Sequence, residues 1–146
     1  MEGPPPTVSQ RWAAIFPAFA LKVRAADLDR ILRGEQSVEI RGATHHVRER
    51  VFLMESETGR VRASATPDAP RPLTSTERSD HAEALAFARY RMPWAWPLND
   101  VREAEEPWVI SPEARRGCPT WVPRARWERY PENETVDTGV TLPIRT

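Results

Sequence analysis

The sequence predicts an α+β fold, a small β-sheet that closes or nearly closes into a barrel with helices flanking it. A short amphipathic segment ends at Gly34, and a strand of alternating polarity follows at once. Two β-rich stretches flank residues 56–59 as in a hairpin, and a tryptophan-rich strand begins at Trp94. With 146 residues, the chain is long enough for one domain with a core and too short to expect two.

The first strand and helix follow from the positions of apolar residues. Phe19–Val23 alternates in polarity, which predicts a strand with one core face and an exposed basic face carrying Ala20, Lys22 and Arg24. A helix is expected to begin near residue 25, with Asp27 on its solvent side. Its apolar stripe recurs at helical spacing: Leu28, Ile31 and Leu32. Gly34 can then take the left-handed conformation that ends a helix.

The strand at residues 37–41 carries the polar residues of greatest interest. Val38 and Ile40 point to one face, and Glu39 and Arg41 point to the other. Glu39 and Arg41 are close enough to pair with each other or to converge on one ligand. We therefore consider both an ion pair that closes a barrel edge and a ligand cleft.

The segment Gly34–Arg41 reads Gly-x-Gln-x-x-Glu-x-Arg and resembles the Gly-x-Lys-x-x-Glu-x-Arg signature of the ASCH domains. These domains belong to the PUA-like β-barrel superfamily. Trp94–Arg102 is similar to the family's late tryptophan-containing strand, and residues 117–121 lie where its closing strand would be. The resemblance covers roughly residues 16–127 and implies an ASCH-type, PUA-like barrel at residues 16–128. A proline-rich N-terminal arm (1–15) and a C-terminal tail (129–146) would flank it.

A cleft beside this motif would suit a nucleic acid or a modified nucleotide, and we expect an RNA-related binding module. Cationic side chains would hold phosphate, Gln36 and Glu39 would read a base, and Trp94 or Trp108 would stack on it. We expect Arg41→Ala to weaken binding and to leave the fold largely intact. The predicted ligand-binding residues are Lys22, Arg24, Gln36, Glu39, Arg41 and Trp94.

A small hydrolase is the first alternative, because some ASCH proteins are amidohydrolases of acetylated cytidine or ribonucleases. The amidohydrolases use the motif lysine and a threonine, whereas this chain has Gln36 and Glu39 at those positions. Glutamine cannot act as a base, so Lys22, the only lysine, would have to replace it, with Lys22 and Glu39 catalytic. We therefore favour a binding module and predict little acetylcytidine hydrolysis. A protein-interaction domain is the second alternative.

Composition limits the other possibilities. The 21 basic and 21 acidic residues cancel, so nucleic-acid binding would have to be local. Cys118 is the only cysteine and lacks the spacing of a disulfide or zinc site, and we expect neither metal nor cofactor. No apolar run or signal peptide is recognisable, which predicts a cytoplasmic protein without a membrane partner. The sequence does not predict the oligomeric state.

The remaining elements are predicted from turns and caps. A hairpin is expected at residues 50–65, and a helix from the capping box at Thr74 to about Tyr90. Pro97 would confine its strand to a sheet edge or a bulge. Residues 111–117 predict a short helix, and residues 120–122 the last strand of the barrel. His45 and His46 are expected in a loop, either solvated or facing a ligand.

Overall fold

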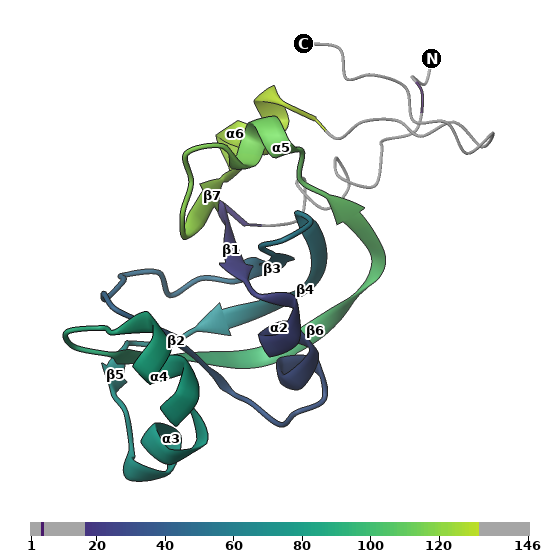
Figure 1. Cartoon of the computed structure of the whole chain (residues 1–146). Coiled ribbons are helices and arrows are strands. Elements are labelled where there is room, and N and C mark those ends of the chain that lie inside the picture. The colour runs from purple at the N-terminus through teal and green to yellow at the C-terminus, as the bar shows by residue number, and fades with distance from the viewer. Residues whose placement is uncertain (1–3, 5–16, 132–146) are drawn as a thin grey trace.

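The computed structural model describes residue 4 and residues 17–131, which form an α+β fold around a curled, mixed sheet (Figure 1). The strands are β1 (Phe19–Val23), β2 (Val38–Arg41), β3 (Val51–Glu55), β4 (Arg60–Pro67), β5 (Arg71–Pro72), β6 (Trp94–Val109) and β7 (Trp121–Pro123). The helices are α2 (Ala25–Leu32), α3 (Ser75–Asp80), α4 (Ala82–Ala88), α5 (Pro112–Arg115) and α6 (Arg124–Arg129). The expected first strand, first helix, hairpin, short helix and last strand are therefore all present.

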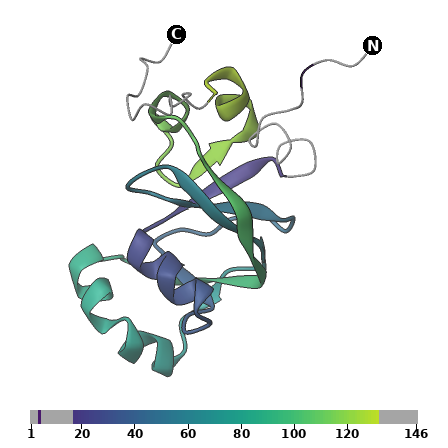
Figure 2. The same ribbon diagram turned by 90° about the vertical axis from the view of Figure 1, so that its right-hand side faces the viewer.

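The sheet runs in the order β2-β6-β4-β3-β1-β7, and β5 pairs with β6. The β1–β3 pair is parallel and the other pairs are antiparallel. Register shifts interrupt the β3–β4 and β4–β6 ladders, and Asp100 on β6 has a φ of 50°. Such bulges bend a strand and increase its twist, which explains how β6 curves along the whole fold (Figure 2). The sheet is therefore a half-barrel. This agrees with the small barrel that the sequence predicts, and the PUA-like type stays a prediction.

Both faces of the sheet are covered. Along β3, Val51 and Leu53 pack on α2, while Phe52 and Met54 pack in a second core around Trp108. The prediction of an exposed face on β1 is therefore wrong for Ala20, which is fully buried in the second core. Figures 1 and 2 show α5 and α6 at one end of the fold and α3 and α4 at the other.

Helix α2 lies over the first core through Leu28 and Ile31, as its apolar stripe predicts. Gly34 follows the helix with a φ of 75°, which confirms its role in ending it. Glu57, in the turn between β3 and β4, accepts a hydrogen bond from the Ala25 N–H at 3.0 Å and so caps the start of the helix. The expectation that Asp27 faces solvent is wrong, because this side chain is buried.

The single helix expected between residues 74 and 90 is two short helices. Thr74 and Glu77 form the predicted capping box at the start of α3. The helix breaks at His81, whose φ of −112° and ψ of 18° are not helical. No residue of α3 or α4 is buried, although Leu85 of α4 packs against a buried apolar cluster.

Strand β6 lies inside the sheet, between β2 and β4. Of the two expectations for Pro97, an edge or a bulge, the edge is not realised; Pro97 lies at an interruption of the ladder, where one neighbour of β6 changes from β5 to β4. The boundary drawn at residue 128 falls within α6. The predicted N-terminal arm, apart from residue 4, and most of the C-terminal tail lie outside the described residues. Within residues 17–131, no helix has both the length and the apolar character needed to cross a membrane.

Candidate functional site

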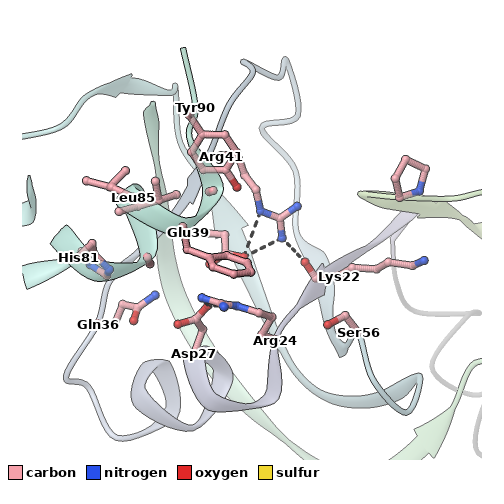
Figure 3. Close-up of a pocket in the computed structure, with 15 residues that line it drawn as sticks. Lys22, Arg24, Asp27, Gln36, Glu39, Arg41, Ser56, His81, Leu85 and Tyr90 are labelled. Atoms are coloured by element: carbon pink, nitrogen blue, oxygen red, sulfur yellow. Dashed lines mark hydrogen bonds and ion pairs between the residues drawn. The ribbon is translucent and has the colours of Figure 1, made fainter. Parts of the chain in front are cut away.

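A cavity of about 350 Å³ lies beside β2, the strand at the end of the sheet (Figure 3). Its walls come from β1, α2, β2 and α4. Five of the six predicted ligand-binding residues line it, and Trp94 does not. The lining residues are Lys22, Arg24, Asp27, Gln36, Glu39, Ile40, Arg41, Ser56, His81, Ala84, Leu85, Phe87, Ala88, Tyr90 and Pro119.

Glu39 and Arg41 form the centre of the polar wall. The Arg41 guanidinium donates to Glu39 Oε2 from Nε at 3.2 Å and from Nη2 at 2.7 Å. Nη2 also donates to the main-chain carbonyl of Lys22 on β1, and Figure 3 shows these contacts as dashed lines. The guanidinium carbon lies 5.5 Å from the centre of the Trp96 ring, which adds a cation–π contact. The orientation of Arg41 is therefore held from several sides.

Two atoms of this pair have no hydrogen-bond partner among the described residues, Glu39 Oε1 and Arg41 Nη1. Only 5% of Glu39 is exposed, yet Oε1 is not among the fully buried polar atoms without a partner, so this oxygen keeps some access to the cavity that Glu39 lines. Next to it, Arg41 Nη1 is a charged donor. An accessible acceptor and donor side by side in a cavity wall can both be satisfied by one ligand that carries the complementary donor and acceptor.

The charge state of Glu39 depends on opposing effects. Burial raises the pKa of the Glu39 carboxyl, and the Arg41 guanidinium opposes that rise. Asp27 adds a smaller contribution that raises the pKa of Glu39 further. A ligand that donated a hydrogen bond to Oε1 would favour the ionised carboxylate.

A second polar network, centred on Asp27, borders the cavity. Arg24 and Arg30 each donate to one Asp27 oxygen, Arg24 from Nε at 3.3 Å. Arg30 Nε also donates to Gln36 Oε1 at 3.1 Å, and Gln36 Nε2 donates to the Val38 carbonyl at 2.8 Å. Gln36 therefore positions the loop before β2, and the base-reading role expected from the sequence stays a prediction.

Sequence reasoning missed Asp27 because helical spacing placed it with the solvent-facing charges. A signal was nevertheless present. Arg24 and Arg30 lie three residues before and after Asp27, and this spacing places all three side chains on one side of a helix. A carboxylate between two arginines is a common way to hold a buried charge.

Lys22 lines the cavity, but its amine points away from Glu39 (Figure 3). Its Nζ donates to the Arg115 carbonyl at 3.4 Å. Burial lowers the pKa of this amine; Cys118 opposes the shift and Arg115 adds to it. In this arrangement the Lys22 amine is not positioned to take a proton from a group bound at Glu39.

The wall opposite the polar pair is mostly apolar. Leu85 of α4 packs on the cluster of Val38, Leu73 and Ala95, together with Ile40. Shorter α4 side chains, Ala84 and Ala88, leave space in front of the helix. The cavity therefore has one hydrogen-bonding side and one apolar side.

Four other residues singled out from the sequence lie outside the cavity lining. Trp94 is half-buried and packs against the first core, and Trp108 is buried in the second. The stacking role expected for Trp108 is therefore wrong. His45 is buried against Trp96 and Trp121, with ring centres 4.5 and 5.6 Å apart, so it is not a solvated loop residue. His46 is exposed, as expected for such a loop.

The lining carries a small positive charge, since Lys22, Arg24 and Arg41 (three) outnumber Asp27 and Glu39 (two) by one. Both arginines pair with a carboxylate. Among residues 17–131, no group of three or more histidine, cysteine or acidic side chains could hold a metal ion.

Comparison with known proteins adds no family assignment. No protein-family model matches the chain, and no curated protein is significantly similar to it. The resemblance of Gly34–Arg41 to the ASCH signature therefore stays a prediction.

Proposed function

We propose that the protein binds a nucleoside or modified nucleotide in the cavity beside β2, and that Glu39 and Arg41 recognise the edge of its base. The observation that carries this proposal is the free Oε1 of buried Glu39 next to the free Nη1 of Arg41. Nucleobase edges place N–H donors beside carbonyl or ring-nitrogen acceptors, which is the complementary pattern.

The shape and polarity of the cavity support the same ligand class. A base has a polar edge and flat faces that pack on apolar groups, and this cavity is lined by Leu85 and Tyr90 as well as by Glu39. Its volume of about 350 Å³ lies within the range of small-molecule sites, roughly 300–1,000 Å³. These features favour one nucleotide unit over a long RNA strand.

Binding is favoured over hydrolysis because of where the cations lie. The amine of Lys22 contacts the Arg115 carbonyl, and the guanidinium of Arg41 is already paired with Glu39. A base-edge ligand needs one acceptor and one donor, which the pair supplies. Amide hydrolysis would also need a group that moves a proton to the leaving amine.

The test is calorimetric titration with cytidine, uridine, adenosine, guanosine and acetylcytidine at fixed low salt. We expect at least one of these to bind, and Glu39→Gln to weaken that binding about tenfold to a hundredfold, since a hydrogen bond to a charged group contributes about 1.5–3 kcal/mol. Glu105→Gln is the matched control, because Glu105 is exposed on β6 and does not line the cavity.

Three results would contradict the proposal. The first is that none of the five probes binds the wild-type protein. The second is equal affinity in wild type and Glu39→Gln. The third is that a short single-stranded RNA binds far more tightly than every nucleoside, with the steep salt dependence of phosphate contacts.

A further inference from the structure

Phe87 is the most exposed large apolar side chain among the described residues, and it lines the cavity. Its side chain is 87% exposed, and Tyr90 and Met92, also partly exposed, follow it in sequence. Exposed apolar residues that gather in one place usually mark a contact with a ligand or partner. Because Phe87 and Tyr90 both line the cavity, a ligand bound there is the nearest occupant.

Phe87 lies on helix α4, and this helix makes few contacts with the rest of the fold. His81, Ala84, Leu85 and Ala88 fall at i, i+3, i+4 and i+7, which turns one face of the helix toward the cavity. Leu85 is the α4 residue that joins the apolar cluster below. Phe87 has therefore room to adjust its ring to a ligand.

The end of α4 returns the chain to the cavity. Arg89 takes a left-handed conformation, with φ of 54°, and its N–H donates to the Leu85 carbonyl at 3.0 Å. Tyr90 then lies against Gly42, where an added Cβ would come within 2.7 Å of Tyr90 Cδ1. Phe87 and Tyr90 thus add two aromatic rings to the lining of the cavity that Glu39 and Arg41 also line.

We propose that Phe87 is a stacking residue, whose ring covers the flat face of the base that Glu39 and Arg41 hold by its edge. This inference rests on the proposed function and adds to it a preference for an aromatic, planar ligand. A saturated ring with the same polar edge would keep the hydrogen bonds and lose the stacking contact.

The test compares uridine with 5,6-dihydrouridine, because the dihydro form keeps the N–H and both carbonyls but has no aromatic ring. Affinities are measured for wild type, Phe87→Leu and Phe87→Trp, and adenosine is titrated as a second aromatic probe. Met92→Leu is the control, since Met92 is 47% exposed but does not line the cavity. Circular dichroism confirms that each variant keeps its fold.

We expect wild type to prefer uridine over dihydrouridine at least fivefold, since stacking contributes about 1–3 kcal/mol per base. Phe87→Leu should bring that ratio close to one and weaken adenosine by a similar factor. Phe87→Trp should keep the preference, and Met92→Leu should leave it unchanged.

The outcomes separate this inference from the proposed function. If Glu39→Gln weakens nucleoside binding but Phe87→Leu keeps wild-type affinity and preference, the stacking role is overturned and the proposed function stands. If wild type binds none of these three compounds and none of cytidine, guanosine and acetylcytidine, both are overturned.

Discussion

Arg41 on β2 donates a hydrogen bond to the main-chain carbonyl of Lys22 on β1, although three strands separate β2 from β1 in the sheet order. The curl of the sheet brings these two strands close together. They do not pair as neighbouring strands, and the Arg41 side chain joins them instead. The same guanidinium holds Glu39 Oε2, so the contact that spans the half-barrel also orients the buried carboxylate. Arg41 therefore belongs both to the candidate site and to the contact between β1 and β2.

Arg41 should therefore matter for stability as well as for binding. Arg41→Met leaves the Glu39 carboxylate buried without its cation, and removing one partner of a buried pair costs about 3 kcal/mol. Urea denaturation should show this loss. Arg102→Met, a change on the exposed surface, should stay within about 0.5 kcal/mol of wild type. A wild-type midpoint for Arg41→Met would support the sequence-based expectation that loss of Arg41 leaves the fold intact.

Gly42 should control the position of Tyr90. An alanine Cβ there would lie 2.7 Å from the Tyr90 ring, which is 38% exposed and can turn outward. Gly42→Ala should therefore cost less than about 1 kcal/mol of stability yet weaken nucleoside binding severalfold. If the effect acts through Tyr90, adding Gly42→Ala to Tyr90→Ala should cause no further loss of affinity. Fully additive losses would show that Gly42 acts by another route.

Stability should fall as the pH drops from about 6.5 to 4. Burial, followed by the charges of Arg48 and His46, lowers the pKa of His45 from 6.5 to about 4. Between these values the unfolded chain binds a proton at His45 that the folded chain does not, so protonation favours unfolding. The slope attributable to His45 is at most about 1.4 kcal/mol per pH unit.

Denaturation of wild type and two variants between pH 4 and 7 measures this effect. His45→Gln should lose most of the slope, whatever its effect on stability at pH 7. His46→Gln removes the exposed neighbour and should keep most of the slope. Parallel pH profiles for wild type and His45→Gln would count against a buried, neutral His45.

Lys22 should contribute little to nucleoside affinity, because its amine contacts the Arg115 carbonyl and points away from Glu39. Lys22→Met should change the dissociation constant less than about threefold. In a parallel chromatographic assay, we expect little acetylcytidine hydrolysis by wild type. Robust turnover that persists in Lys22→Ala would contradict both the binding proposal and the catalytic role considered for Lys22.

The elements nearest the motif were predictable because local signals agree there. Leu28, Ile31 and Gly34 describe a helix and its end, and the strand that follows at Val38–Arg41 needs no distant partner to be recognised. The cluster of Lys22, Arg24, Glu39 and Arg41 at one cavity was also expected.

Features that depend on the three-dimensional fold could not be read from the sequence. Ala20 looks like a surface position until α6 and β7 cover it, and the break at His81 leaves no strong sequence signal such as proline. The apolar wall of the cavity was missed because Phe87 and Tyr90 lie far along the chain from Glu39, and α4 brings them together only in the folded protein.

The state of the Glu39 carboxyl group during ligand binding tests the central claim most directly. Carbon-detected nuclear magnetic resonance can follow the side-chain carboxyl signal of Glu39 over pH, first in the free protein and then with the tightest-binding nucleoside at saturation. We predict a pKa raised by burial in the free protein and lower when the nucleoside is bound, because a hydrogen bond donated to Oε1 favours the charged form. An unchanged Glu39 signal and pKa at saturating nucleoside would contradict the account.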